Sequence, residues 1–121
     1  MNAAKSYGYH LLERTQHSVT VAQKNSKQLI CYNVLNFNEF ESRKKHMSIV
    51  LQPCSTDIPS EEVEIWFKGA DIETVHRLDK SNILNKKYLS HIEQYTKTLS
   101  EEGLRILVWA KRVISLQEVK I

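Results

Sequence analysis

Apolar and polar residues alternate along much of this chain, which is the pattern of β-strands with one face turned toward a core. In the segment HMSIVLQ, residues 46–52, every odd-numbered position is apolar. The segment EVEIWFK, residues 62–68, has its odd-numbered positions apolar as well. Both segments therefore predict strands, and we expect Pro53 to end the first and Gly69 to break the second.

Four further segments are rich in β-branched and aromatic residues, which favour extended backbone. They predict strands over residues 9–15, 18–23, 29–37 and 104–114. The last is the most apolar of the six predicted strands, so we expect it to occupy a central or well-covered position in the sheet. Residues 53–61 contain both prolines and several small polar residues, which predicts a surface loop.

A different spacing of apolar residues marks the helices. Within residues 85–102, apolar side chains recur at intervals of four, three and four, which predicts a helix with one apolar stripe. The members of this stripe are Tyr88, Ile92, Tyr95 and Leu99. We expect Gly103 to close this helix, and a shorter helix over residues 71–79 to begin with Asp71 as its N-cap. Residues 2–8 predict the tail of a helix that stops at its final glycine.

The order of these elements indicates the fold class. Most strands come before the helices instead of alternating strictly with them, which is typical of α+β proteins. We therefore expect an antiparallel β-sheet of about six strands with helices packed on it. A chain of 121 residues can bury its own core, so residues 1–121 are predicted to form a single domain.

Composition and charge restrict the possible functions. Seventeen Lys and Arg against fourteen Asp and Glu give a net charge of +3, which is far from a strongly basic nucleic-acid-binding domain. Cys31 and Cys54 lie far apart and the five histidines are scattered, so neither a metal site nor a disulfide is predicted. No segment resembles a signal peptide or a membrane span, so we expect a soluble piece of protein.

The densest positive charge is the segment SRKKH, residues 42–46, which follows Phe37 and Phe40. A nucleotide or a nucleic acid would suit cations beside aromatic rings, and a solvated turn between strands is the plain alternative. With only three glycines, the chain contains no glycine-rich phosphate loop and no nucleophile elbow. Any bound nucleotide must therefore be held without such a loop.

A second candidate is the segment WFKGAD, residues 66–71. A strand delivers Lys68 to its end, Gly69 permits a tight turn, and a helix begins near Asp71. Such a junction can surround a phosphate with an ammonium and free N–H groups, although ordinary strand-to-helix turns look the same in sequence. Arg105, at the start of the last strand, is either a cation at the rim of a site or a side chain whose stem covers apolar surface.

Four motifs occur together in a fixed order: AAKSYGY, EFESRKKHMS, KGAD and EGLR, spanning residues 3 to about 112. In this order the chain resembles the nucleotide-binding domain of P-type ATPases, most closely the type IV branch, the phospholipid flippases. The resemblance implies the fold of that domain and a site for ATP, with Mg²⁺ entering together with the nucleotide. It implies no catalytic residue and no metal ligand within this chain.

The resemblance also implies a role for individual residues. Phe40 corresponds to the phenylalanine that stacks on adenine, and Lys45 to a lysine that lines the nucleotide pocket. Lys68 corresponds to the lysine deep in the pocket, and Arg105 to the arginine that reaches toward the phosphates. Secondary candidates from the same motifs are Met47, Gly69 and Ala70. Flippases usually carry arginine, lysine and arginine before the methionine, whereas this chain has Lys44, Lys45 and His46.

Further parts of such an ATPase are not found in this sequence. They are an acidic segment ahead of the alanine pair, the phosphorylated aspartate with its domain, the actuator domain and the membrane segments. The resemblance therefore implies an excised domain that binds ATP at the cytosolic face of a membrane without hydrolysing it alone. Its partners would be the phosphorylation and actuator domains, with a phospholipid as substrate of the whole protein and no nucleic acid. The alternatives are an ATPase-like regulatory or interaction module that has lost transport, and a weak nucleic-acid-binding module.

Overall fold

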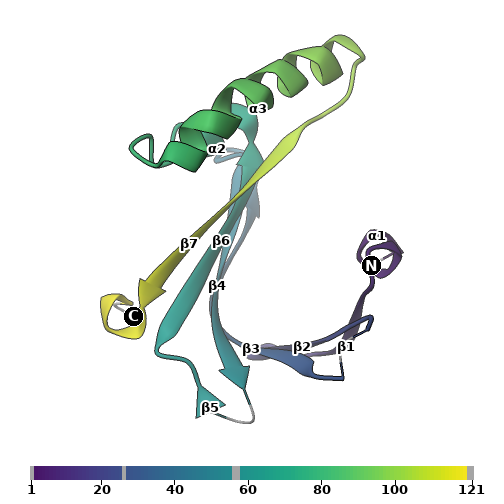
Figure 1. The fold of residues 1–121 in the computed structure, drawn as a ribbon, viewed down its shortest axis with the longest axis vertical. Helices are drawn as coiled ribbons and strands as arrows, with labels where there is room; N and C mark the ends of the chain where they lie inside the picture. Colours follow the sequence, from purple (N-terminus) through teal and green to yellow (C-terminus); the bar gives the residue numbers. More distant parts are fainter. Residues whose placement is uncertain (1, 26, 56–57, 120–121) are drawn as a thin grey trace. The chain divides into compact units, whose positions relative to one another are not determined.

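The computed structural model describes residues 2–25, 27–55 and 58–119, and its central feature is an antiparallel sheet of seven strands (Figure 1). The sheet has the strand order β1-β2-β3-β4-β6-β7, and β5 pairs with β4 outside this path. The strands are β1 Tyr9–Arg14, β2 Ser18–Gln23, β3 Leu29–Glu41, β4 His46–Ser55, β5 Ile58–Pro59, β6 Glu62–Ala70 and β7 Leu107–Ser115. The helices are α1 Asn2–Ser6, α2 Asp71–Val75, α3 Ile83–Glu101 and the 3₁₀ turn Leu116–Glu118. The α+β class is confirmed.

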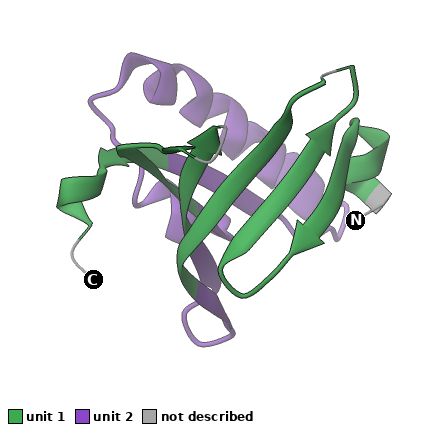
Figure 2. Cartoon of the chain, turned by 90° about the horizontal axis from the view of Figure 1, so that it is seen from below, with its two compact units in different colours: residues 1–37, 49–66, 112–121 green, residues 38–48, 67–111 purple. Residues whose placement is uncertain are grey.

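The internal contacts divide the chain into two compact units (Figure 2). Unit 1 consists of residues 1–37, 49–66 and 112–121, and unit 2 of residues 38–48 and 67–111. Every residue predicted to bind the nucleotide belongs to unit 2. The single domain over residues 1–121 stays a prediction.

In unit 1, strands β1, β2 and β3 form an antiparallel meander. Val19 of β2 lies opposite Arg14 of β1 on one side and Tyr32 of β3 on the other. Helix α1 precedes this meander, and Gly8 ends the helical segment with a φ of +90°, a conformation that glycine adopts without strain. The predicted helix tail and the first three predicted strands are therefore confirmed, with β3 running four residues beyond its expected end at Phe37.

The predicted end of the fourth strand at Pro53 is wrong. Strand β4 continues through Pro53 to Ser55, where it pairs with β5. Proline lacks an N–H donor, but its carbonyl is still available, and the Pro53 oxygen accepts a hydrogen bond from the Ser60 amide at 2.8 Å. Within the expected surface loop over residues 53–61, residues 53–55 and 58–59 are thus strand and residues 60 and 61 are not, while residues 56 and 57 lie outside the described residues.

The core of unit 1 is small. Val63 of β6 is its one fully buried large apolar side chain among the residues described. Gln52 of β4 is buried and polar, and its amide is satisfied twice: its nitrogen donates to the Ser60 carbonyl at 2.8 Å and its oxygen accepts from Asn33 at 3.3 Å. Buried amides require such partners, so these bonds fix the conformation of the side chain.

In unit 2, α2 and α3 follow β6 and lead back to β7. Asn82 is the N-cap of α3, since its side-chain oxygen accepts from the Leu84 and Asn85 amides. At the other end, Gly103 has a φ of +79°, its amide donates to Ser100 and that of Leu104 to Leu99. This pair of bonds is a Schellman motif and confirms that Gly103 closes the helix. None of the described helices has both the length and the hydropathy that crossing a membrane requires.

Three expectations about unit 2 are corrected by the structure. Gly69 does not break β6, which continues to Ala70. Asp71 is the first residue of α2 and not its N-cap, because Ala70 occupies the capping position without a side-chain bond. The strand β7 lies at the end of the strand order, with Trp109 63% exposed, so it is neither central nor well covered.

The apolar stripe of α3 also differs from its prediction. Tyr88 and Tyr95 are 51% and 69% exposed, whereas Ile92 and Leu99 are half-buried. The half-buried positions are Asn85, Leu89, Ile92, Thr96 and Leu99. Their intervals of four, three, four and three still follow one helix face, but this face is rotated by about one residue from the predicted one. Tyrosine was counted as apolar, although its hydroxyl tolerates solvent well.

Candidate functional site

The basic segment forms the turn between β3 and β4. The amides of Lys44 and Lys45 both donate to the Glu41 carbonyl, at 3.0 and 2.7 Å, and close a tight hairpin. Lys45 has a φ of +60°, the left-handed conformation that such a turn needs at its last residue. Lys44 also forms an exposed ion pair with Glu41 at 3.1 Å, which compensates part of the positive charge.

This hairpin touches the end of β6 through its backbone. The Lys45 carbonyl accepts a hydrogen bond from the Ala70 amide at 3.0 Å. A Cβ atom on Gly69 would lie 2.9 Å from the Lys45 oxygen and 2.7 Å from the His46 Cβ, both too close for ordinary contacts. Glycine is therefore required at position 69 because the two strands approach each other there, and not because of its φ. Two motifs that are separate in sequence meet at this contact.

A cluster around Phe67 surrounds the same contact. The His46 ring stacks on Phe67 with 4.8 Å between ring centroids, and the Arg77 guanidinium lies 5.1 Å from the Phe67 centroid. Arg77 in turn forms a 2.9 Å ion pair with Glu73, one helical turn earlier. Neither Phe67 nor Arg77 is among the site residues predicted from the sequence. The one available signal was the placement of a histidine and an aromatic residue next to the two motifs.

The charges of this cluster lower the pKa of one carboxyl group, that of Glu73. The Arg77 guanidinium hydrogen-bonded to Glu73 lowers the pKa of that carboxyl below its ordinary value, and the positive charges of His46 and Lys45 act in the same direction more weakly. Glu73 is thus held as a carboxylate beside the basic hairpin. Its negative charge partly offsets the cations that would attract an anionic ligand.

Phe40, the predicted adenine platform, lies near the end of β3, where its side chain is 53% exposed. An aromatic ring that is exposed to this extent can accept a base on its face. Met47, a secondary candidate, is half-buried on the neighbouring strand β4. Phe40, in the strand before the turn, and Lys45, the last residue of the turn, therefore belong to one hairpin.

The other two predicted cations come from later elements. The Lys68 ammonium lies over the Trp109 ring, 4.9 Å from its centroid, so that β6 and β7 are linked by a cation–π contact. Arg105 is exposed in the short segment between α3 and β7. Within the described residues, no side-chain hydrogen bond or ring contact connects Phe40 or Arg105 to the other predicted site residues. The direct contacts join Lys45 to Gly69 and Ala70.

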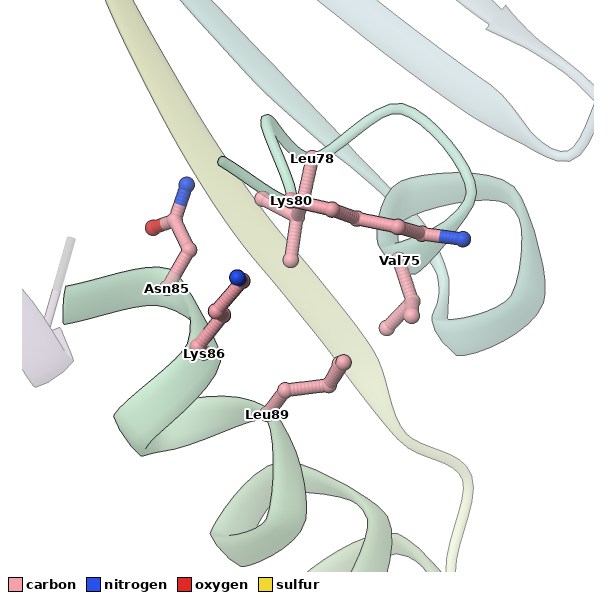
Figure 3. Close-up of a pocket in the computed structure, with 6 residues that line it drawn as sticks. All are labelled: Val75, Leu78, Lys80, Asn85, Lys86 and Leu89. Carbon is pink, nitrogen blue, oxygen red and sulfur yellow. The ribbon is translucent and has the colours of Figure 1, made fainter. Parts of the chain in front are cut away.

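A cavity of about 230 Å³ lies elsewhere in unit 2, between α2 and α3 (Figure 3). Three aliphatic side chains, two lysines and an asparagine line it: Val75, Leu78, Leu89, Lys80, Lys86 and Asn85. Figure 3 shows Leu78 and Leu89 directed into the space between the two helices. None of the predicted nucleotide-binding residues lines this cavity, so the candidate site is the surface around the hairpin and not this hollow.

The chemistry of the candidate residues fits a nucleotide. Lysine and arginine side chains are the usual partners of phosphate oxygens, and an exposed phenylalanine offers a stacking surface for a base. Within the described ranges, no group of three or more His, Cys, Asp or Glu side chains is placed to hold a metal ion. The fit therefore concerns the base and the phosphates.

Comparison with known proteins gives a consistent answer, although no family model matches the chain. It is similar to phospholipid-transporting ATPase IC of Mus musculus, with 35% identity over 68% of this chain and 6% of the relative. It is also similar to probable phospholipid-transporting ATPase 7 of Arabidopsis thaliana, with 31% identity over 98% of this chain and 9% of the relative. A third relative is phospholipid-transporting ATPase VA of Homo sapiens, with 32% identity over 96% of this chain and 8% of the relative.

These relatives come from mouse, a plant and human, and all three are named as phospholipid-transporting ATPases. The chain spans less than one tenth of the length of each of them. The similarity extends over most of the chain, including both the basic hairpin and the segment after α3. The chain therefore belongs to the family of the type IV, phospholipid-transporting P-type ATPases.

Proposed function

We propose that this chain is an ATP-binding segment of a phospholipid-transporting P-type ATPase. In this proposal adenine stacks on Phe40, and the ammonium groups of Lys45 and Lys68 bind the phosphates together with the guanidinium of Arg105. Met47, Gly69 and Ala70 shape the surface between these groups. The relatives are named as phospholipid-transporting ATPases, and ATP must be bound by some part of such a protein.

The observation that carries the proposal is the hydrogen bond between the Lys45 carbonyl and the Ala70 amide. It joins the hairpin that bears the exposed aromatic ring to the strand end that bears the second lysine. The two strands approach each other so closely at Gly69 that no side chain fits between them. This arrangement is therefore fixed by the backbone and does not depend on flexible side chains. This backbone contact between the β3–β4 hairpin and the end of β6 supports the proposal that Phe40, Lys45 and Lys68 act on one ligand.

In the whole protein, this segment would hold ATP so that the γ-phosphate can reach an aspartate in a separate domain. Mg²⁺ bound to the phosphates would neutralise part of the charge that develops during transfer. The role of the residues described here is binding and orientation. The phospholipid substrate, the phosphorylation and actuator domains and the position at the cytosolic face of a membrane belong to this proposal for the complete protein.

The affinity expected of this surface is low. A single base stack contributes roughly 1 to 3 kcal/mol, and phosphate contacts with exposed lysines are weakened by water and salt. The sum corresponds to a dissociation constant on the order of millimolar. An open surface of this kind would release ADP readily, which suits a site that must be emptied in every transport cycle.

A backbone amide NMR titration with MgATP tests the proposal. We expect saturable shift changes for residues of the β3–β4 hairpin and of the segment 68–70, and at Arg105. Phe40→Ala should weaken the binding by about tenfold or more. Phe37→Ala is the matched control, because its ring lies on the opposite face of the same strand and contacts Arg14.

Three results would contradict the proposal, and the first two concern ATP itself. One is the absence of localised shifts at about 10 mM nucleotide, since a site weaker than the millimolar range would bind no ATP in practice. The other is a response that Phe40→Ala and Phe37→Ala weaken equally, because adenine would then not rest on Phe40. Equal responses to ATP and to inorganic triphosphate would likewise assign the interaction to charge alone.

A further inference from the structure

Trp109 is an exposed tryptophan with a defined partner. Its side chain is 63% exposed on β7, and the Lys68 ammonium lies 4.9 Å from the centroid of its ring. Large aromatic side chains are normally covered, because each can bury 150–250 Å² of surface. Trp109 instead presents its ring to a cation and to solvent. Neither its exposure nor its partner is explained by packing.

The position of Trp109 on the strand connects it to the candidate site. Exposure alternates over residues 105–110: the even-numbered side chains are half-buried and the odd-numbered ones exposed. Leu107 and Trp109 therefore share the exposed face of β7, and Arg105 precedes them on the exposed side of the chain. Lys68 reaches the same face from the neighbouring strand β6. Two of the proposed phosphate ligands thus adjoin the exposed face on which Trp109 lies.

From this geometry we propose that Trp109 is a positioning residue for ATP, which holds the Lys68 ammonium in place for the phosphates. The inference rests on the proposed function and adds a residue to it. A lysine side chain has four rotatable bonds and is flexible when exposed. The indole face restrains the ammonium on one side and leaves its other N–H donors free for phosphate oxygens. Trp109 acts here through Lys68, without touching the nucleotide.

The expected effect is small but measurable. Cation–π contacts at exposed sites are weak, so removing the ring should raise the dissociation constant for MgATP about two- to fivefold. Trp109→Leu removes the ring, whereas Trp109→Phe keeps a weaker aromatic face and should retain much of the affinity. Tyr95→Leu removes an equally exposed aromatic ring of α3 and should have no effect.

The decisive experiment is a double-mutant cycle measured by NMR titration with MgATP. It compares wild type, Trp109→Leu, Lys68→Met and the variant with both substitutions. If Trp109 acts through Lys68, Trp109→Leu changes the affinity in the wild type and has no further effect once Lys68 is methionine. An equal loss in both backgrounds would overturn the inference, because Trp109 would then contact the nucleotide or support the fold independently.

A second measurement does not involve ATP. The indole ring current should shift the side-chain methylene protons of Lys68 upfield, and this shift should vanish in Trp109→Leu but not in Tyr95→Leu. If ATP binds around Phe40 while the affinity is unchanged in Trp109→Leu, the inference fails and the proposed function stands. If the wild type binds no ATP, both fail, even with the ring-current shift present.

Discussion

At the scale of single residues, Gly69 is the position on which the candidate site depends most. Alanine there would place its Cβ 2.7 Å from the His46 Cβ and 2.9 Å from the Lys45 oxygen. We expect Gly69→Ala to separate the hairpin from β6, to weaken the bond between Lys45 and Ala70, and to lower the stability by about 1–3 kcal/mol. Denaturant unfolding measures the loss, and amide hydrogen exchange at Ala70 locates it.

Gly103→Ala is the matched control for this substitution. Nothing lies within 4 Å of a Cβ there, but the φ of +79° strains any other residue. We expect a loss of about 1 kcal/mol that is confined to the end of α3. If Gly69→Ala were as mild as the control and left the Ala70 amide protected, the close approach of the strands would not be what requires glycine at position 69.

The ion pair between Glu73 and Arg77 predicts a dependence on pH. Because Arg77 lowers the pKa of the Glu73 carboxyl in the folded state, the pair stabilises the fold fully above the ordinary value of 4.5. This contribution is lost as the pH falls through the lowered folded pKa. The ¹³C shift of the Glu73 carboxyl should therefore titrate below that ordinary value, and in Arg77→Met its pKa should rise. An unchanged titration would show that Arg77 is not the cause.

At the scale of elements, the two helix starts in unit 2 predict losses of stability of different size. The Asn82 side chain accepts two backbone hydrogen bonds at the start of α3, at 2.9 and 3.2 Å. Asn82→Ala should cost about 1 kcal/mol of stability, and Asn82→Asp should preserve the cap. Asp71→Ala should cost less than Asn82→Ala, because the Asp71 side chain caps nothing. Thermal unfolding followed by circular dichroism compares the three variants.

The face of α3 gives a further test at this scale. Leu89 is half-buried and lines the cavity beside α2, whereas Tyr95 is 69% exposed. We expect Leu89→Ala to lower the free energy of unfolding by about 1–2 kcal/mol, less than a fully buried leucine would lose, and Tyr95→Ala by less than about 0.5 kcal/mol. If both variants lost the same free energy of unfolding in urea, the packed face of α3 would include Tyr95, as the sequence predicts.

These elements show what the sequence could and could not predict. Strand and helix positions follow from local periodicity, so the sheet and the helix over residues 85–102 were recognisable. The stripe on α3 was misplaced because tyrosines look apolar in sequence, while the side that a helix buries is chosen by its neighbours. The continuation of β4 through Pro53 was missed because proline disrupts only the donor side of a strand.

The candidate site likewise has a part that the sequence predicts and a part that only the structure shows. Phe40, Lys45, Lys68 and Arg105 were selected from motif order, which requires no geometry. The contacts of His46 and Arg77 with Phe67 join residues of β4, β6 and the turn after α2, and Trp109 contacts Lys68 across two strands. No local sequence pattern predicts which of these side chains touch, because such contacts depend on strand order and register.

At the scale of the whole molecule, the small core sets the expected stability. Among the described residues only Val63 is a buried large apolar side chain, while many large apolar side chains are exposed. A protein that buries so little surface has a low free energy of unfolding. Even a weak ligand therefore changes its unfolding temperature measurably. This makes thermal unfolding a sensitive measure of ATP binding even at millimolar affinity.

If the dissociation constant is about 1 mM, MgATP at about 10 mM stabilises the folded state by about 1.4 kcal/mol, which raises the unfolding temperature by roughly 4–8 °C. We expect this shift to increase with the logarithm of the ATP concentration and to disappear in Phe40→Ala. Inorganic triphosphate at the same ionic strength should produce a much smaller shift, because it lacks the base. Equal shifts with both ligands, or a shift retained in Phe40→Ala, would mean that the cations of the hairpin bind polyphosphate without using the aromatic platform.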